Sequence, residues 1–421
     1  MDASTVEKAY ALSRERYAGL GVDADAALET LGKVSISLPC WQGDDVHGFE
    51  KAKEPAYSGG IQATGNYPGR ARTVDELRQD LKAALSLIPG DHRVNLHAIY
   101  GEFGNRPVSR NEVEPEHFRG WLTWAKAENL KLDFNATCFA HPKAARGFTL
   151  SSPEKETRKF WIDHVKCCRR IAAFLGRELK SAAMHNLWIP DGSKDQPVDR
   201  WTPRLLLKEA LDEIFKVEYS PSVMKDSLEG KLFGIGSEYY VVGSHEFYLA
   251  YALAKRKILC LDLGHFHPTE SVADKLSALL QFFDELAVHL SRPVRWDSDH
   301  VVILDDEMRR LAEEIVLGQA LERVHLAMDF FDASMNRVGA WVIGARAVLK
   351  AFLLALLQPL KQLREAETEG DYFRRLALFE DAKILPSGAV WDRHCLEQGV
   401  PLDGEWHSVV RDYERAVLSK R

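Results

Sequence analysis

A strand, a helix and a second strand can be read in residues 258–300, ILCLDLGHFHPTESVADKLSALLQFFDELAVHLSRPVRWDSDH. The first apolar run, 258–263, contains one acid, Asp262, and the second, 286–290, contains one histidine, His289. A polar side chain inside a buried strand is costly unless a partner compensates it. Carboxylates and imidazoles without thiols suit a divalent cation such as Mn²⁺, Mg²⁺, Co²⁺ or Zn²⁺. The pattern predicts a metal site at the ends of these strands.

The same alternation of strands and helices continues along the chain in both directions. Strands are expected at 34–38, 93–99, 131–136, 182–189, 223–229, 258–263, 286–290 and 323–329. Helices are expected at 73–89, 114–129, 153–176, 203–216, 246–257, 269–282, 305–317 and 337–367. Eight strands that alternate with eight helices predict an α/β fold, the (β/α)8 TIM barrel. A doubly wound open sheet is the alternative, although no G-x-G-x-x-G motif follows an expected strand.

No linker or shift in composition divides the 421 residues. We therefore expect a single domain over residues 1–421, with the barrel core at about 34–335. A helical N-terminal addition is expected over residues 4–32. The remaining residues, 336–421, are expected to form a helical C-terminal extension that mediates subunit contacts, with a further helix at 372–380.

Composition and charge exclude several classes of protein. A hydrophobic fraction of 46% supports a large core, and the net charge of −7 argues against nonspecific binding of nucleic acid. The start, MDASTVEKAY, shows no secretory signal, and the apolar run 340–358 is interrupted by two basic residues and so is expected to be a core helix. The six cysteines fit neither a zinc knuckle nor a disulfide framework. We expect a soluble cytoplasmic protein with free thiols and no membrane partner.

Four successive expected strands end in polar side chains, namely Glu229, Asp262, His289 and Asp329. A closed barrel brings the carboxyl ends of its strands together, so these side chains are expected to converge on one point. Three carboxylates at one point repel each other unless a cation or protons neutralise them. The strand ends therefore predict one buried cation site.

Residues just beyond the strands predict a second cation. His265 follows Asp262 by three residues, and Asp297 and Asp299 lie on one side of an extended segment. Asp262 would bridge the two cations. Other strand ends carry Trp41, Asp44, His97, Asn135, Asn186, Trp188, Asp191, Lys231 and Asp332. For single residues simpler interpretations stay open: His97 and His289 as core histidines, Trp188 as packing, and Asp305 and Asp306 as a helix N-terminus.

Long runs of the sequence resemble the L-rhamnose isomerase family. They are CWQGDDVHGFE (40–50), TGNYPG (64–69), NLHAIY (95–100), WIPDG (188–192), KLFGIG (231–236), CLDLGHFHPTE (260–270), SRPVRWDSDHV (291–301) and LAMDFFDAS (326–334). The similarity covers nearly the whole chain. It implies a xylose-isomerase-like barrel, a cytoplasmic homotetramer that needs two divalent metals, usually Mn²⁺, and interconversion of L-rhamnose and L-rhamnulose.

The resemblance also implies roles for individual residues, and no motif position departs from the family pattern. Ligands of a structural metal would be Glu229, Asp262, His289 and Asp329; those of a catalytic metal would be His265, Asp297, Asp299 and the shared Asp262. Lys231 would bind the substrate oxygen beside the carbonyl, His97 would serve ring binding and opening, and Trp188 would form an aromatic wall. Lys231, Asp329 and His97 are the expected catalytic residues.

The expected reaction is an aldose–ketose isomerisation by a metal-assisted hydride shift. Lys231 is expected to be protonated beside so many carboxylates. The glycine-rich segment 59–69 is expected to close over its own site or a neighbouring subunit's site. A ketose 3-epimerase or another sugar isomerase is the main alternative. A metal-dependent phosphodiesterase would need a more basic groove, and a sugar-binding or scaffold protein would lack some of the ligands.

Overall fold

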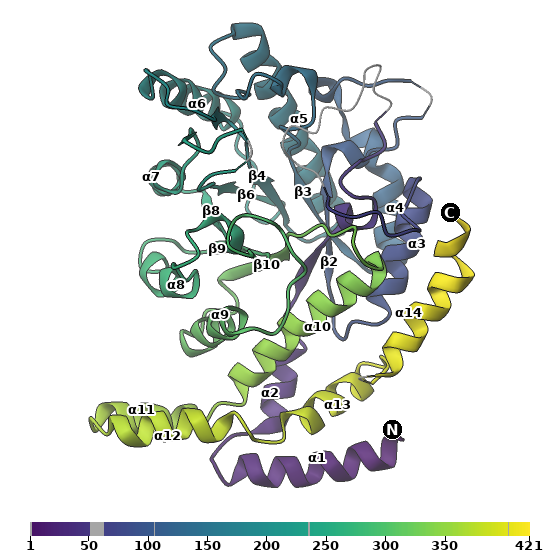
Figure 1. Ribbon diagram of the computed structural model, residues 1–421, viewed down its shortest axis with the longest axis vertical. Helices are drawn as coiled ribbons and strands as arrows, with labels where there is room; N and C mark the ends of the chain where they lie inside the picture. Colours follow the sequence, from purple (N-terminus) through teal and green to yellow (C-terminus); the bar gives the residue numbers. More distant parts are fainter. Residues whose placement is uncertain (1, 51–62, 105, 235, 403) are drawn as a thin grey trace.

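The chain folds as a closed parallel barrel. The computed structural model describes residues 2–50, 63–104, 106–234, 236–402 and 404–421. Its barrel strands neighbour each other in the order β1-β10-β9-β8-β6-β4-β3-β2 (Figure 1). They are β1 (Ile36–Pro39), β2 (Arg93–His97), β3 (Lys131–Asn135), β4 (Ala183–Leu187), β6 (Met224–Glu229), β8 (Ile258–Asp262), β9 (Leu286–Leu290) and β10 (Val324–Met328). The predicted TIM barrel is confirmed, and each strand overlaps its predicted range.

One helix follows each barrel strand. These helices are α3 (Val74–Leu85), α4 (Arg119–Ala127), α5 (Lys155–Leu179), α6 (Trp201–Ile214), α7 (His245–Lys255), α8 (Ala273–Leu279), α9 (Asp306–Leu317) and α10 (Arg337–Leu356). Helix α3 shows why they form where they do: the Thr73 side chain caps the Glu76 amide, and Leu77 and Leu81 are buried toward the barrel. Short 3₁₀ helices η1–η7 occupy Cys40–Gly43, Ala98–Tyr100, Arg110–Glu112, Pro115–Phe118, Pro142–Ala144, Leu263–His265 and Leu418–Lys420.

Helix α10 belongs to the barrel ring. It packs against α9, α3 and β1, so the predicted core boundary at residue 335 falls inside the last strand–helix repeat. By length and composition α10 could cross a membrane, but 83% of its apolar window is buried in the fold, which agrees with the expected core helix. The single helix expected over 337–367 is broken at Pro359, which lacks the amide hydrogen that a continuous helix needs, and α11 (Leu360–Thr368) begins directly after it.

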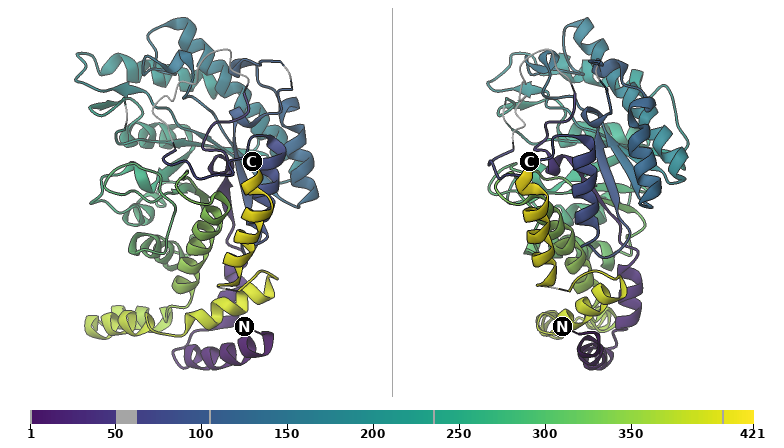
Figure 2. Two further views of the ribbon diagram at one scale, coloured as in Figure 1. Left: turned by 45° about the vertical axis from the view of Figure 1, so that its right-hand side comes forward. Right: turned by 90° about the vertical axis from the view of Figure 1, so that its right-hand side faces the viewer.

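The terminal helices gather beyond one end of the barrel. Helices α1 (Ala3–Ala18) and α2 (Ala24–Leu31) precede the barrel, and α12 (Tyr372–Ala382), α13 (Ser387–Glu397) and α14 (Glu405–Ala416) follow α11. Figures 1 and 2 show α1, α11, α12 and α13 as a layer below the barrel, from which α14 rises along its side. Ser13 ties the two ends of the chain together by donating to the carbonyl of Pro386 at 2.9 Å. Helices α13 and α14 lie within the predicted helical extension, although their bounds were not predicted.

A small antiparallel ladder connects two loops at the carboxyl ends of the strands. Strands β5 (Gly192–Ser193) and β7 (Tyr240–Val241) pair with each other, and neither was predicted. The amide of Val242 donates to the carbonyl of Asp191 at 3.0 Å, and the amide of Lys231 donates to the carbonyl of Gly243 at 3.1 Å. The ladder therefore fixes the segment that carries Lys231 next to the segment that follows β4.

Candidate metal centre

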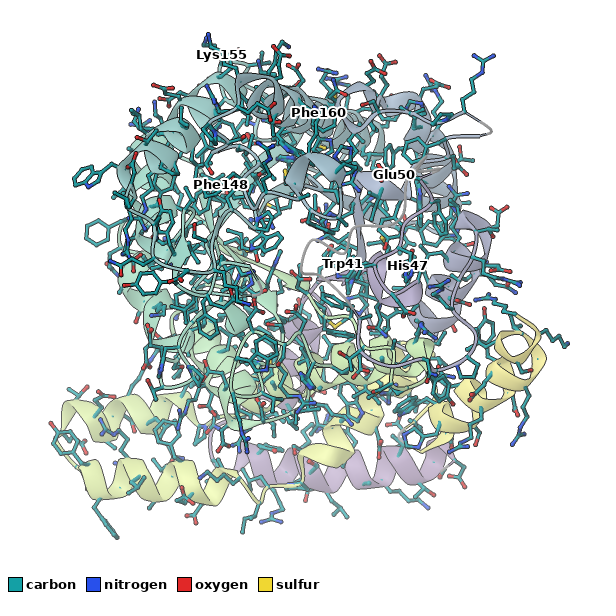
Figure 3. The ribbon with its side chains drawn as sticks, turned by 45° about the horizontal axis from the view of Figure 1, so that its top comes forward. Trp41, His47, Glu50, Phe148, Lys155 and Phe160 are labelled. Carbon is teal, nitrogen blue, oxygen red and sulfur yellow. The ribbon has the colours of Figure 1, made fainter. Side chains whose placement is uncertain are left out.

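A cavity of about 790 Å³ opens at the carboxyl ends of the strands. Trp41, His97, Trp188, Glu229 and Lys231 all line it, and the loops after β9 and β10 complete its wall. In Figure 3, Trp41 lies near the centre of the view, and Lys155, at the start of α5, lies at its outer edge. These five strand-end side chains therefore face a single cavity, at the end of the barrel where TIM-barrel proteins carry their functional sites.

The register of the strands brings four of the predicted side chains to one point. Asp262 on β8 is level with His289 on β9, and Asp329 follows β10, where its amide donates to the carbonyl of Leu290. Among the described residues, Glu229, Asp262, His289 and Asp329 form one group whose ligand atoms all lie within 4.8 Å of one another. Nδ1 of His289 is 3.0 Å from Asp329 Oδ2 and 3.3 Å from Glu229 Oε2. The predicted convergence of four strand ends is therefore present.

Several buried polar atoms in this group and in the second predicted set make no hydrogen bond with any described residue. They are Oδ2 of Asp262, Oδ1 of Asp297, Nδ1 of His265 and Nδ1 of His289. The short separations from Nδ1 of each histidine to a carboxylate lack hydrogen-bond geometry. Buried polar atoms without partners are rare and need a reason. Buried oxygen and imidazole donors that lie close together without hydrogen bonds between them are the donors that hold divalent cations.

The charges of the group also call for a cation. Burial, together with the neighbouring Glu229 and Asp329, raises the pKa of Asp262, although His265 opposes this shift. Burial and the nearby Asp297 and Asp329 raise the pKa of Asp299 well above its usual value. Burial disfavours the charged imidazole of His265, but Asp262 and Asp297 outweigh it and raise its pKa. Protons thus partly balance the carboxylates when no metal is bound, and a divalent cation would replace them.

The second predicted set lies beside the first at the cavity wall. Nε2 of His265 is 3.4 Å from Asp297 Oδ2, and Nδ1 of His265 is 3.1 Å from Glu229 Oε1. A Cβ atom on Gly264 would lie 3.1 Å from Asp262 Oδ1 and 3.3 Å from Asp297 Oδ1, so glycine leaves the room these carboxylates need. Among the described residues, the ligand atoms of this second set do not all lie within 4.8 Å of one another, as those of the first set do.

Asp299 is held in an unusual backbone conformation. Its φ of 41° lies in the left-handed region, which residues other than glycine adopt at a cost of about 1–3 kcal/mol. Its carbonyl accepts a hydrogen bond from the amide of Phe331 at 3.3 Å, which ties the loop after β9 to the loop after β10. Because strained backbone conformations are often found at functional sites, this conformation supports a role for Asp299 in the cavity.

Lys231 and Trp188 form one side of the cavity. The Lys231 ammonium lies 4.9 Å from the centre of the Trp188 ring, and the same ring stacks on His265 at 6.3 Å. Burial lowers the pKa of Lys231, and Asp297 and Asp299 only partly offset it. The acidic neighbours favour the charged form of Lys231, as expected, but burial has the larger effect on its pKa. That Lys231 is protonated stays a prediction.

His97, at the end of β2, lies among aromatic rings. Trp41 contacts its ring edge-on at 4.8 Å and Phe139 at 5.4 Å, while its Nδ1 is 3.1 Å from Thr137 Oγ1. Burial, with a smaller effect of Arg110, lowers the pKa of His97 to about 3. The imidazole is therefore neutral near neutral pH, when it can donate one hydrogen bond and accept another.

Other polar strand-end residues serve the scaffold. Asp44 accepts hydrogen bonds from the Tyr100 hydroxyl at 2.6 Å and the Gly48 amide at 2.7 Å. Asp191 accepts from the amides and hydroxyls of Thr149 and Ser151, so it anchors a loop. Asn186 donates to Glu229 Oε2 at 2.5 Å, which orients that carboxylate, and Asn135 donates to Asn95. Asp332 lines the cavity, but its Oδ1 accepts from Ser334.

Some residues of the site were not predicted. Phe139, Trp296, His300 and Phe331 line the cavity from loops, where the sequence has no periodicity to reveal them. Ser291 donates to Asp262 Oδ1 at 2.8 Å. Of the glycine-rich segment, residues 59–62 lie outside the described residues, and Ala63, Thr64 and Gly65 line the cavity of their own chain. The Tyr67 amide donates to the carbonyl of Ala333 at 2.7 Å.

The fold and the converging side chains define a (β/α)8 barrel protein with a candidate divalent-cation centre. The sequence pattern of the L-rhamnose isomerase (RhaA) family matches residues 4–421. A relative in Rhodopirellula baltica named L-rhamnose isomerase is 55% identical over 419 residues, covering 100% of this chain and 98% of its own. One of the same name in Klebsiella pneumoniae is 54% identical over 418 residues and covers 99% of both chains. The chain belongs to the L-rhamnose isomerase family.

Solved structures with similar barrels are more distant in sequence. An L-ribulose 3-epimerase is 11% identical, with a TM-score of 0.45 over 79% of this chain and 97% of its own. A xylose isomerase domain protein from Alicyclobacillus acidocaldarius is 15% identical, with a TM-score of 0.43 over 66% of this chain and 93% of its own.

Proposed function

We propose that this protein interconverts L-rhamnose and L-rhamnulose, an aldose–ketose isomerisation. The observation that carries the proposal is the convergence of Glu229, Asp262, His289 and Asp329, of which Glu229 and Asp329 line the cavity. The family to which the chain belongs, and the whole-length relatives that carry the name L-rhamnose isomerase, support the choice of sugar. An open-chain sugar of this size has room in a cavity of about 790 Å³.

Two divalent cations complete the proposed site. Glu229, Asp262, His289 and Asp329 would hold the structural one, and His265, Asp297 and Asp299 would hold the catalytic one together with Asp262. Donors of this kind accept Mn²⁺, and also Co²⁺, Mg²⁺ or Zn²⁺; we propose Mn²⁺ as the resident ion on the resemblance to the family. Such a pair supplies Lewis-acid stabilisation of negative charge on adjacent sugar oxygens.

The chain's own residues would bind and orient the sugar. Trp188 offers an apolar face to the sugar ring and methyl group. Lys231, held against Trp188 and beside Asp297 and Asp299, would donate a hydrogen bond to the oxygen next to the carbonyl, where negative charge develops. His97, neutral at working pH, would pass a proton between the ring oxygen and the anomeric hydroxyl during ring opening.

We propose that hydrogen moves between C2 and C1 as a hydride. A proton-transfer route needs a base within reach of C2 and with a pKa near the working pH. Asp297, Asp299 and Asp329 are assigned to cations, and the low pKa of His97 makes it a weak base. His300, whose Nδ1 lies 3.0 Å from Ser298 Oγ, is the base that a proton-transfer route would use.

The decisive experiment runs the Mn²⁺-loaded enzyme on L-rhamnose in deuterated water. NMR should show L-rhamnulose with essentially no deuterium at C1. Lys231→Met should slow turnover by about 10²–10³-fold without changing this isotope pattern. Lys225→Met, on strand β6 just before Lys231 and paired with Glu285, should leave turnover largely intact. Substantial deuterium at C1 in the wild-type product would overturn the hydride route, and a 3-epimer in place of the ketose would overturn the function.

We also propose a cytoplasmic homotetramer in which the C-terminal helices form subunit contacts. The exposed apolar side chains of α12 support this, since Tyr372, Phe373 and Leu376 are 62%, 86% and 62% exposed. Light scattering on the wild type and on Phe373→Glu tests the contact. The wild type should have four times the mass of the chain, and the variant should have a lower mass.

A further inference from the structure

One thiol lies directly below the proposed metal centre. Cys260 precedes Asp262 by two residues on β8, so both side chains point into the barrel from the same face of the strand. Cys260 is level with Glu229 on the neighbouring strand β6, and Asp262 is level with His289 on β9. The interior of the barrel therefore has two adjacent levels of potential ligands, and only the upper one was expected from the sequence.

Glu229 and His289 are shared between the two levels. Among the described residues, Glu229, Cys260 and His289 form a second group whose ligand atoms all lie within 4.8 Å of one another. All three side chains are buried, and Cys260 is only 2% exposed. His289 Nδ1 lies 3.0 Å from Asp329 Oδ2 and 3.3 Å from Glu229 Oε2 without hydrogen-bond geometry to either. This buried nitrogen is therefore available as a ligand in the region that both groups surround.

We propose that Glu229, Cys260 and His289 form an alternative site that captures soft divalent cations such as Zn²⁺ and Cd²⁺ and so displaces the resident ion. Thiolate and imidazole ligands select such ions, whereas Mn²⁺ and Mg²⁺ prefer the oxygen ligands of the upper level. A tetrahedral zinc ion with bonds of about 2.0–2.3 Å holds its donors roughly 3.3–3.8 Å apart. Side-chain rotations that bring the three donors about 1 Å closer would therefore form the site, with water as a fourth ligand. This inference rests on the proposed metal centre.

The capture is an exchange of a proton for a cation. The sulfur–hydrogen bond of Cys260 breaks, its proton leaves to water, and the sulfur forms a bond to the incoming ion. No electron is transferred. Because Glu229 and His289 serve both levels, an ion held by Cys260 takes ligands from the upper group, and the two kinds of ion exclude each other.

The test is a titration of metal-free protein with Cd²⁺, read by the thiolate-to-metal charge-transfer band in the ultraviolet. The wild type should develop this band up to one equivalent. Cys260→Ser and Cys260→Ala should lack it, and Cys138→Ser, which removes another buried thiol, should keep it. Affinity for Cd²⁺ should fall about tenfold or more in the Cys260 variants, while affinity for Mn²⁺ should change less than about threefold.

The outcomes separate this inference from the function on which it rests. Cd²⁺ binding without a band in the wild type, or an undiminished band in both Cys260 variants, would overturn the alternative site and leave the metal centre standing. A wild-type protein that binds neither Cd²⁺ nor Mn²⁺ would instead overturn the metal centre itself. Circular dichroism of each variant checks that the barrel is folded, and having two substitutions at Cys260 guards against a folding defect in either one.

Discussion

Two buried aspartates inside the barrel differ in how their charge is balanced. Asp133 on β3 accepts hydrogen bonds from Nε and Nη2 of Arg93 at 2.8 and 2.7 Å, from Ser37 Oγ at 2.6 Å and from the Met184 amide at 2.8 Å. Oδ1 of Asp262 on β8 accepts from Ser291 and from the Gly264 amide, but its Oδ2 accepts no hydrogen bond from a described residue. Both side chains are almost fully buried.

The contrast separates a structural ion pair from a site that needs a ligand. Burial alone would raise the pKa of Asp133, but Arg93 outweighs it and lowers that pKa. At Asp262 burial, Glu229 and Asp329 prevail over the neighbouring histidines, and the pKa is raised. The chain therefore supplies its own counter-charge at Asp133, whereas at Asp262 a cation from outside would supply it. Four predictions test this difference.

The largest effect is expected from Asp262→Asn, which removes the carboxylate proposed to bridge both cations. Turnover should fall by at least about 10²–10³-fold, and bound Mn²⁺, measured by atomic emission, should fall with it. The metal-free variant should melt at the same temperature as the metal-free wild type or higher, because one of several repelling acids is gone. A variant that retains both ions and its rate would show that Asp262 is a structural residue like Asp133.

The opposite result is expected for Asp133→Asn. Arg93 would then be left as a buried charge without its partner, which costs about 3–5 kcal/mol of unfolding free energy. Urea unfolding should show this loss, while the folded fraction should still bind Mn²⁺ normally. Loss of metal without loss of stability would contradict the assignment of Asp133 to the scaffold.

The contributions of the two aspartates to the free energy of unfolding should depend on pH in opposite directions. The lowered pKa of Asp133 contributes stability above the unfolded value of about 3.9, and this contribution is lost as the pH falls. The raised pKa of Asp262 means that the metal-free folded protein holds a proton that the unfolded chain has lost, so its stability falls as the pH rises from about 4 toward neutrality.

Metal-free Asp262→Asn should therefore match the metal-free wild type near pH 4 and exceed it by about 1–2 kcal/mol at neutral pH. Unfolding curves collected across that range in a chelating buffer measure the difference. Added Mn²⁺ should stabilise the wild type more than the variant, since a ligand of the folded state shifts unfolding by its affinity. A difference that stays constant with pH would exclude Asp262 as its source.

The sequence predicted the barrel because its strands are short apolar runs bounded by regular helices. The converging ligands followed from this, since a closed barrel leaves no other place for the ends of four adjacent strands. Their assignment to two separate cations was drawn from the residues just beyond the strand ends, is also implied by the resemblance to the family, and stays a prediction. Ladder β5–β7 was missed because two residues carry no periodicity, and α13 and α14 lie in a tail whose partners are the distant α1, α2 and α10.

The sequence also could not predict properties that depend on how deeply a side chain is buried. The pKa of Lys231 falls because desolvation exceeds the attraction of Asp297 and Asp299, and no sequence pattern gives that balance. Phe139 and Trp296 reach the cavity from loops, whose paths are set by tertiary contacts. Cys260 could have been found, since its spacing of two residues from Asp262 places both on one face of the strand. The assumption of a site without thiols concealed it.

The smallest effects should come from one hydroxyl beside each aspartate. Ser291 donates to Asp262 Oδ1 at 2.8 Å, and Ser37 donates to Asp133 Oδ2 at 2.6 Å, so each serine-to-alanine change removes a single buried hydrogen bond. At Asp262 the bond orients a proposed ligand, and losing such support typically lowers metal affinity by about 10–100-fold. Ser291→Ala should therefore weaken Mn²⁺ binding by about that factor in calorimetric titrations, with little change in metal-free stability.

At Asp133 three other hydrogen bonds remain, so Ser37→Ala should cost only about 1 kcal/mol of unfolding free energy and leave Mn²⁺ affinity unchanged. Equal losses of stability in the two variants, with no change in metal affinity in either, would mean that both aspartates belong to the scaffold.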